Sequence, residues 1–323
     1  MAATTPPRKL LSRRRVLKVL GLGAAGSVCG AAWMRFVEPA WLKVARVTVP
    51  ISSAERPAVR VLQLSDFHAS EVVPLSLVRD AVEAGLAQKP DLVCLTGDFI
   101  THQFEAFEEY AAILRRLSDA APTFAVTGNH DGGKWAAARF GAPRAEKLRA
   151  MVRESGLFQA ANHVRHRVLG HRGGYADTSA VRAMLGAARI EVLTNRSVEV
   201  TVNSRRLTLV GMGDLWAQEL YAAAAFADVK PAPDRTIICL SHNPDGKDLL
   251  KPHPWSLVLC GHTHGGQLLV PLVGEPFAPV EDRRFVKGLH RWEDRWIYIT
   301  KGVGNLHGVR LNCRPEVSLL KLA

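Results

Sequence analysis

The chain has 323 residues, and its hydrophobic content of 47% and charged content of 22% are those of a folded soluble protein rather than of a disordered chain. The net charge of +12 is concentrated in two places: residues 1–35 carry seven basic and no acidic residues, and residues 132–172 carry nine basic and two acidic ones. The rest of the chain is nearly neutral. This distribution disfavours a nucleic-acid-binding module, in which a basic patch or stripe covers the folded surface.

The first 35 residues have the order of an export signal, with a basic region before a short apolar one. The stretch SRRRVLK (Ser12 to Lys18) resembles a twin-arginine signal, although Val16 stands where Phe is commoner. The uncharged stretch 19–34 has sixteen residues, fewer than the roughly 20 of a comfortable membrane span. We expect the twin-arginine export machinery as a partner, and the domain 36–323 to lie in the periplasm or on the outer face of the cytoplasmic membrane. The leader is either removed or kept as an anchor, and a basic tail before a buried helix is the alternative.

Five short apolar runs follow, and each ends in polar residues: 59–68, 90–98, 122–131, 236–245 and 257–264. Runs of this length, bounded by turn residues, are typical of strands buried on both faces. Between the first three lie PLSLVRDAVEAGLAQ and FEAFEEYAAILRRL, whose apolar residues recur at helical spacing. RWIYIT and EVSLLKL predict closing strands. The alternation of strand and helix predicts an α/β fold in one catalytic domain.

Each of the five runs ends in side chains that can ligate a metal ion. In α/β folds, ligands bind beyond the carboxyl ends of the strands, so these side chains are expected to converge. In the last run, His262 and His264 lie two residues apart, and side chains at that spacing in an extended segment share a face. Imidazoles that converge at a strand end favour a transition metal. The candidate residues are Asp66, His68, Asp98, Asn129, His130, His242, His262 and His264.

The motifs D-x-H, G-D, G-N-H-D, a later His and G-H-T-H together resemble those of the calcineurin-like metallophosphoesterases, over roughly residues 58–131 and 175–323. The resemblance implies a four-layer α/β sandwich of two mixed β-sheets flanked by helices, with a dinuclear metal site at the strand ends. Carried over by position, one metal would be held by Asp66, His68 and His264. The other would be held by Asn129, His242 and His262, and Asp98 would bridge both. His130 would face the substrate as a catalytic residue rather than bind a metal.

The chemistry of these residues agrees with that assignment. Imidazole nitrogens combined with carboxylate and amide oxygens suit two divalent ions such as Mn, Zn or Fe. Metals bound in this way lower the pKa of a shared water molecule, so that hydroxide can attack phosphorus near neutral pH. A protonated His130 could donate to the departing oxygen, whereas Asp131 is expected to be structural. The predicted protein is a metal-dependent phosphoric ester hydrolase that acts on a phosphodiester or pyrophosphate bond, with an envelope lipid or polymer as substrate.

Departures from the family pattern narrow the choice of branch within the family. GDFITH lacks the Asp-Arg pair that protein Ser/Thr phosphatases carry at the second motif. SHNPD, GHTHGGQ and the leader resemble the bacterial membrane- or wall-associated phosphoesterases. They also resemble the UDP-2,3-diacylglucosamine pyrophosphatases of lipid A synthesis, whose cytoplasmic work conflicts with export. A non-catalytic metal-binding scaffold is the alternative of another class, although no expected ligand is missing. We expect a monomer.

Other segments allow two interpretations each. The basic insertion 132–172 follows the third motif directly and should emerge beside the metals. It is either a solvated helix that closes the domain or a lid that meets a membrane surface and steers an anionic phosphate to the site. His307 and Arg310 lie in the glycine-rich GVGNLHGVR, which could approach substrate, but structural roles are favoured. Three cysteines lie inside apolar runs and are predicted to be buried thiols rather than ligands: Cys94, Cys239 and Cys260.

Overall fold

The computed structural model describes residues 26–51, 57–101, 104–132, 177–232 and 235–323. Within these ranges, strands and helices assemble around two six-stranded sheets. The first sheet has the order β1 (Lys43–Val49), β12 (Glu316–Leu322), β2 (Val59–Leu64), β3 (Leu92–Thr96), β4 (Thr123–Val126) and β5 (Glu191–Val192). The second has the order β10 (Gly288–Trp292), β11 (Arg295–Ile299), β9 (Leu257–Cys260), β8 (Thr236–Leu240), β7 (Arg205–Gly211) and β6 (Arg196–Val202).

Both sheets are mixed, as expected. In the first, β2 through β5 run parallel, and β12 pairs antiparallel with β2. In the second, β7, β8, β9 and β11 run parallel, with the antiparallel strands β6 and β10 at the edges. Because parallel strands end at the same side of a sheet, the loops after β2, β3 and β4 meet those after β8 and β9.

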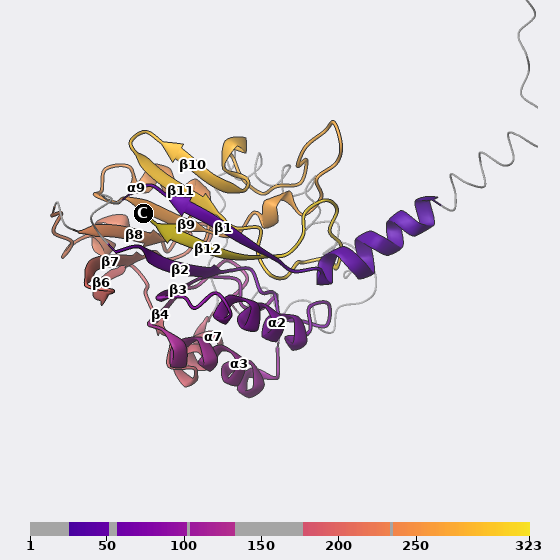
Figure 1. The fold of residues 1–323 in the computed structure, drawn as a ribbon, viewed down its shortest axis with the longest axis horizontal. Helices are drawn as coiled ribbons and strands as arrows, with labels where there is room; N and C mark the ends of the chain where they lie inside the picture. The colour runs from indigo at the N-terminus through magenta and orange to yellow at the C-terminus, as the bar shows by residue number, and fades with distance from the viewer. Residues whose placement is uncertain (1–25, 52–56, 102–103, 133–176, 233–234) are drawn as a thin grey trace, which may run out of the picture.

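Helices cover the outer faces of the two sheets (Figure 1). The first sheet is covered by α2 (Leu75–Leu86), α3 (Phe107–Ala120) and α7 (Ser179–Ala187). On α2, Val78 and Val82 are fully buried one turn apart, in agreement with the helical spacing in the sequence. The short helices α8 (Ala222–Ala225) and α9 (Lys247–Leu250) lie against the second sheet.

Three hydrophobic clusters separate the layers. One fills the space between α2, α3, α7 and the first sheet, the second lies between the two sheets, and the third covers the outer face of the second sheet. The predicted four-layer sandwich is therefore confirmed. The cysteines predicted to be buried thiols, Cys94, Cys239 and Cys260, are buried and free.

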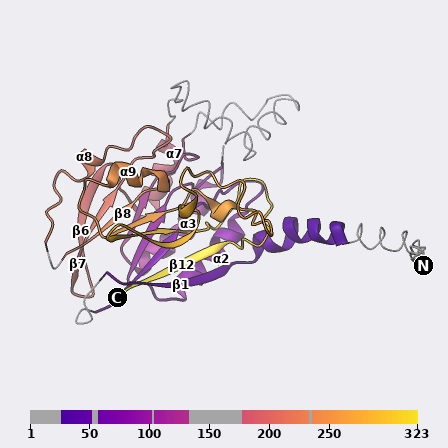
Figure 2. The ribbon, with the colours of Figure 1, turned by 90° about the horizontal axis from the view of Figure 1, so that it is seen from above.

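A helix at residues 26–32 continues into η1 (Trp33–Val37) and η2 (Glu38–Ala40) and projects from the body (Figures 1 and 2). Among the described residues, no helix has the length and apolar character that crossing a membrane requires. The twin-arginine motif and the basic insertion beyond residue 132 lie outside the described ranges, so the leader and the lid stay predictions.

Candidate metal centre

Seven of the eight candidate residues meet in two overlapping groups at the predicted strand ends. Asp66, His68, Asp98 and His264 place one ligand atom each within 4.8 Å of one another, and so do Asp98, His242 and His262. Asn129 completes the second group, since its Oδ1 lies 3.2 Å from His242 Nε2. Asp98 is the one residue that both groups contain. The sequence prediction divided the residues in the same way.

The first group draws on both sheets. His68 follows β2, and its Nε2 lies 3.0 Å from Nε2 of His264, which follows β9. Asp98 Oδ2 is 3.4 Å from the His68 nitrogen, and Asp66 Oδ1 is 3.5 Å from the His264 nitrogen. All four residues are almost completely buried. Close-set imidazole nitrogens and carboxylate oxygens of this kind match the ligand set of a transition metal.

The second group has one ring fixed by a backbone hydrogen bond. His242 follows β8, and its Nδ1 donates to the Thr96 carbonyl at the end of β3, 2.7 Å away. This bond directs Nε2 toward Asp98 Oδ2 at 3.1 Å and His262 Nδ1 at 3.2 Å. Metal-binding histidines are commonly oriented by such a bond from the opposite ring nitrogen.

His262 and His264 do not lie on one extended strand, and that part of the sequence interpretation is wrong. β9 ends at Cys260, and the two histidines have φ values of 70° and 51°, in the left-handed region. Their rings therefore enter different ligand groups instead of sharing a face. The left-handed region is also occupied by Asp66, His68 and Asp98. Asp and His tolerate it better than most residues, and such strain concentrates at functional sites.

The glycines of the motifs are required by close packing around the carboxylates. A Cβ placed on Gly128 would lie 2.3 Å from Asp98 Oδ1, and one on Gly261 would lie 2.4 Å from Asp66 Oδ2. Contacts this short do not occur between a Cβ and a neighbouring oxygen. Glycine at these positions lets the loops after β4 and β9 approach the ligands.

Burial and charge set the protonation of the group. Burial alone would raise the pKa of the Asp98 carboxyl, but attraction by His242 and His130, together with the hydrogen bond from His242, outweighs it and holds the pKa well below its usual range. Burial opposes the charged form of His242, yet Asp98 and Asp66 raise its pKa to about 10.

The other imidazoles and Asp66 respond mainly to burial. Burial lowers the pKa of His68 and His262 well below the ordinary value, and burial together with the Arg310 charge lowers that of His264 to about 3. These three rings are therefore neutral near pH 7 and keep a lone pair for a metal ion. Burial also raises the pKa of Asp66 to about 7.

Two buried atoms fit ligation by a cation. Asp66 Oδ2 and His262 Nε2 have no hydrogen-bond partner among the described residues. Buried polar atoms are nearly always satisfied, so unsatisfied atoms of ligand chemistry inside a ligand cluster point to an ion. The residues therefore fit the two divalent metals that the motifs imply.

Asp131 holds the loops together and does not join the ligands. Its carboxylate accepts hydrogen bonds from the backbone N–H groups of Asp98, Phe99, Ile100 and Gly128 at 2.7–3.4 Å. The prediction of a structural role agrees with these contacts.

His130 lies at the edge of the centre. Its backbone N–H donates to Asp98 Oδ1 at 2.8 Å, and its Nδ1 lies 3.3 Å from the Thr101 carbonyl. Because a carbonyl only accepts, Nδ1 carries a hydrogen. The ring lines the pocket beside the ligands, as the sequence interpretation required of a residue that faces substrate.

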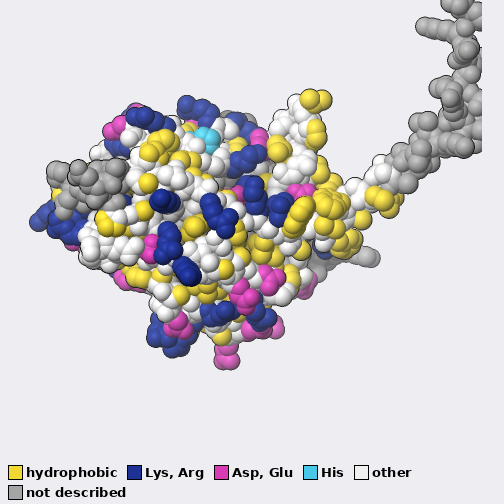
Figure 3. Space-filling view, in the orientation of Figure 1, with side chains coloured by type: hydrophobic (Ala, Val, Ile, Leu, Met, Phe, Trp, Pro, Cys, Tyr) yellow, Lys and Arg dark blue, Asp and Glu magenta, His cyan; other side chains and the backbone are white. Residues whose placement is uncertain are grey.

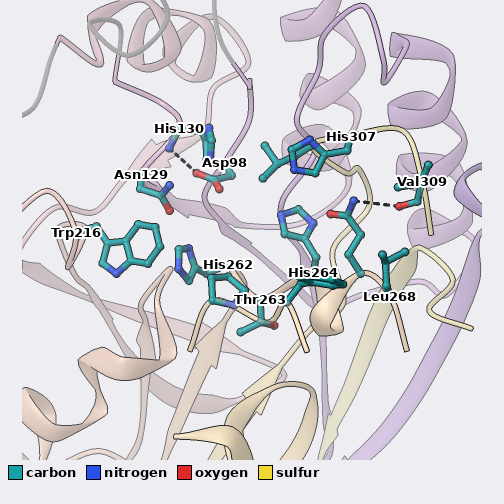
Figure 4. Close-up of a pocket in the computed structure, with 14 residues that line it drawn as sticks. Asp98, Asn129, His130, Trp216, His262, Thr263, His264, Leu268, His307 and Val309 are labelled. Atoms are coloured by element: carbon teal, nitrogen blue, oxygen red, sulfur yellow. Dashed lines mark hydrogen bonds between the residues drawn. The ribbon is translucent and has the colours of Figure 1, made fainter. Parts of the chain in front are cut away.

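A pocket of about 210 Å³ opens over the ligands (Figure 4). One wall carries Trp216, whose ring stands nearly perpendicular to that of His262 with centroids 4.4 Å apart. The opposite wall comes from two loops and is largely apolar, with Leu268, Phe277, Leu306 and Val309. His307 also lines this wall.

Arg310, in contrast, is fully buried and donates to the backbone carbonyls of Lys301, Gly302 and Cys313 at 2.9–3.3 Å. This is the structural role that the sequence favoured. The arginine fixes the loop that presents the apolar wall.

One acidic residue at the same edge was missed. Asp214 follows β7, is buried, and accepts a hydrogen bond from the backbone N–H of Ala217 at 2.8 Å. Burial raises its pKa to about 6, against the attraction of His242. The stretch LTLVGMGD has the same layout as the five identified runs, an apolar segment that ends in polar residues, and like the run 90–98 it ends in Gly-Asp. That pattern was the signal that could have placed Asp214 and the neighbouring Trp216 at the site.

A model of the calcineurin-like phosphoesterase family matches residues 59–266. The chain belongs to this family. The match begins with β2 and ends with the loop of His262 and His264, so it spans both ligand groups. Together with the phosphodiesterase and pyrophosphatase relatives described next, it makes the protein a metal-dependent hydrolase of phosphoric esters.

Bacterial relatives match the chain over nearly its whole length. The phosphodiesterase YaeI of Escherichia coli (strain K12) is 39% identical and the match covers 97% of this chain and all of the relative. The UDP-2,3-diacylglucosamine pyrophosphatase LpxG of Chlamydia trachomatis is 26% identical over 92% of this chain and 94% of its own length. The uncharacterized metallophosphoesterase YkuE of Bacillus subtilis (strain 168) is 24% identical, with 97% and 98% covered.

Proposed function

We propose that the protein hydrolyses a phosphodiester or pyrophosphate bond of an envelope lipid or polymer at a dinuclear metal centre. The observation that carries this proposal is the sharing of Asp98 between two buried ligand groups. Two-metal phosphoesterases hold two ions close together, and a carboxylate that belongs to both ligand groups could bind both ions. The 39% identity to a phosphodiesterase supports the class of bond.

The residues divide as the motifs imply. Asp66, His68 and His264 would hold one divalent cation, Asn129, His242 and His262 the other, and Asp98 both. Bound there, the cations would supply positive charge for a phosphoryl oxygen and acidify the attacking water. Mn, Zn and Fe suit this mixture of nitrogen and oxygen donors.

The protein's own groups orient the reaction. The Thr96 carbonyl fixes the His242 ring, and the His130 backbone N–H fixes the Asp98 carboxylate. With its Nδ1 hydrogen directed to the Thr101 carbonyl, His130 has Nε2 as the ring nitrogen that can exchange a proton with the departing oxygen.

The pocket supports an apolar component in the substrate. Leu268, Phe277, Leu306 and Val309 lie within the same pocket as the ligands, and no phosphate ester group needs such a wall. An acyl chain or another apolar part next to the phosphoester would bury surface against it. The leader of residues 1–35 adds the expectation that this work takes place outside the cytoplasmic membrane.

The similarity to LpxG favours a second candidate, cleavage of the pyrophosphate of UDP-2,3-diacylglucosamine. A non-catalytic metal-binding scaffold is the candidate of another class. It is disfavoured because every expected ligand and His130 are in place.

A substrate panel with metal analysis tests these candidates. The purified chain, loaded in turn with Mn, Zn or Fe, is assayed on bis(p-nitrophenyl) phosphate, p-nitrophenyl phosphate and UDP-2,3-diacylglucosamine. We expect two metals per chain and preference for a diester or pyrophosphate over the monoester. Two bound metals with no hydrolysis of any substrate would favour the non-catalytic metal-binding scaffold. One bound metal per chain would contradict the dinuclear centre.

A further inference from the structure

An apolar surface lies where the N-terminal helix leaves the body. Trp33, Phe36, Val37 and Trp41 are between 42% and 72% exposed at this position. In the space-filling view, hydrophobic side chains gather at the base of the projecting helix and on a protruding loop on the same side of the molecule (Figure 3). We call these four residues the helix-base patch.

A hairpin contributes the second part of the surface. Val270 and Gly274 pair across it, and Leu272 at its tip has a φ of 67°. Leu272 is fully exposed and Val273 is 67% exposed. Two large aliphatic side chains at the tip of a turn add nothing to a core, and contiguous exposed apolar surface marks an interaction site.

Backbone hydrogen bonds join the two parts. Arg310 N–H donates to the Met34 carbonyl at 3.0 Å, which fixes the helix to the loop that follows β11. Leu269 N–H donates to the Leu311 carbonyl at 2.8 Å, which fixes the hairpin to the same loop. The helix-base patch and the hairpin are thus held on one support.

That support also forms the apolar wall of the pocket. Leu268 directly precedes the hairpin-fixing Leu269, and Val309 directly precedes Arg310. The Gln267 side chain donates to the Val309 carbonyl at 3.0 Å and ties the two wall segments together (Figure 4). The surface therefore begins where the pocket wall ends.

The chemistry of the surface identifies its partner as a bilayer of anionic lipids. The helix at 26–32 is uncharged and exposed along its length, and in the sequence it belongs to the uncharged stretch 19–34. Trp33 and Trp41 meet edge to face, 5.7 Å apart, and tryptophan is favoured at the level of the lipid headgroups. Two arginines lie over rings of the patch: Arg35 over Phe36 and Arg314 over Trp41. Basic residues at this depth attract anionic headgroups.

We propose that the helix-base patch and the hairpin dock together on the surface of an anionic lipid bilayer. Docking there places the apolar pocket wall at the headgroups, so that a phosphoester carried by a membrane lipid reaches the metal centre without leaving the bilayer. The docking surface itself does not depend on the proposed activity. Only the statement that a lipid-borne phosphoester is the substrate rests on the proposed function.

A label on the hairpin can distinguish docking of the whole surface from anchoring through the N-terminal segment alone. A fluorophore whose emission can be quenched is attached to Val273→Cys in the full-length chain. This chain also carries Cys29→Ser, which removes the exposed cysteine, and its other native cysteines are buried. The chain is reconstituted in vesicles of phosphatidylethanolamine and phosphatidylglycerol with brominated acyl chains. A matched label is attached at Leu249→Cys, and Leu249 is 51% exposed on α9. In both ribbon views, α9 lies far from the N-terminal helix (Figures 1 and 2).

We expect brominated lipid to quench the label at position 273 several-fold more than the label at 249, and iodide in the aqueous phase to show the reverse. Equal lipid quenching at the two positions, or none at 273, would overturn the proposal, since the domain would then hang free of the bilayer. Protection of position 273 from both quenchers would also overturn it, because a second copy or another protein would then cover the hairpin.

A second variant tests the consequence for substrate. Leu272→Ser combined with Val273→Ser changes only exposed side chains. Hydrolysis of a soluble chromogenic diester should be unchanged, whereas kcat/KM for a lipid-linked phosphoester in the same vesicles should fall by about tenfold. Equal loss on both substrates would overturn the selective effect of docking. Lipid quenching at 273 without hydrolysis of any phosphoester would uphold docking and reject the proposed activity.

Discussion

The two halves of the metal centre are oriented by different means. In the second group, a hydrogen bond to the Thr96 carbonyl sets the His242 ring. In the first group, the remote Nδ1 atoms of His68 and His264 have no hydrogen-bond partner within the described part of the chain. Those two rings stack with centroids 4.8 Å apart and are placed by burial and by left-handed backbone conformations. The His242 ring is therefore fixed by a hydrogen bond, and the His68 and His264 rings are fixed by packing and backbone conformation. Asp98 belongs to both halves, and the Asp66 carboxylate also links them because it accepts a hydrogen bond from the His262 backbone N–H at 2.8 Å.

Removal of the shared carboxylate should have the largest effect. Asp98→Asn takes the anionic oxygen from both groups, so kcat/KM for a diester should fall by about three orders of magnitude, which corresponds to about 4 kcal/mol. Metal content, measured on the same sample, should fall below two ions per chain. Asp119→Asn is the matched control, because Asp119 is exposed and pairs only with Arg189 in the described structure. Activity that survives in the Asp98 variant would mean that the two halves of the metal centre do not need a shared carboxylate.

The adjacent histidines test whether the halves bind metal independently. His264→Ala should remove one ion and leave the second group, while His262→Ala should remove the other ion and leave the first. Each variant should retain about one metal per chain and lose roughly 100-fold or more in kcat/KM. If either substitution released both ions, the halves would have to be treated as one cooperative site.

The close approach of the β4 loop can be tested without removing a ligand. Gly128→Ala places a methyl group 2.3 Å from Asp98 Oδ1, so the loop must shift, at an expected cost of about 3 kcal/mol in the free energy of unfolding. Gly186→Ala is the matched control, since a Cβ at that position of α7 meets nothing within 4 Å. The control should stabilise the helix by about 0.5–1 kcal/mol. Denaturant titration of both variants measures the difference, and similar values would mean that the loop is not tightly held.

Much of the site could be predicted because polar residues at strand ends are visible as breaks in apolar runs. The runs that end at Asp66, Asp98, Asn129, His242 and His262 stand out for this reason. Parallel pairing then brings them to one edge, which follows from the alternation of strand and helix. Asp214, which follows β7, obeys the same rule.

The rest depends on backbone conformation and on loops. The left-handed φ values of His262 and His264 are imposed by the turn into η4, and no periodicity in the sequence reports them. The apolar pocket wall comes from two loops, around Leu268 and Leu306, that are joined by long-range hydrogen bonds of the backbone and of the Gln267 side chain. The contact of the N-terminal helix with residue 310 is of the same kind, and a leader motif gives no sign of it.

The smallest expected effect is a dependence of stability on pH that arises from Asp245, in the loop after β8. Asp245 accepts hydrogen bonds from the Glu281 backbone N–H at 3.0–3.1 Å, and burial raises its pKa to about 6 from 3.8. Because the folded protein holds this proton more tightly than the unfolded chain, the stabilisation is complete below about pH 4 and is lost as pH rises to about 6. The change should be about 2 kcal/mol in the free energy of unfolding.

Asp245→Asn should flatten that slope, as denaturant titrations at pH 4.5 and pH 7 would show, with Asp248→Asn as the exposed control on α9. The amide oxygen of the variant can still accept from Glu281, so the loop should keep its position while its proton linkage disappears. An unchanged slope would place the pH-sensitive group elsewhere. The next residue to substitute would then be Asp214, whose pKa burial also raises to about 6, against the attraction of His242.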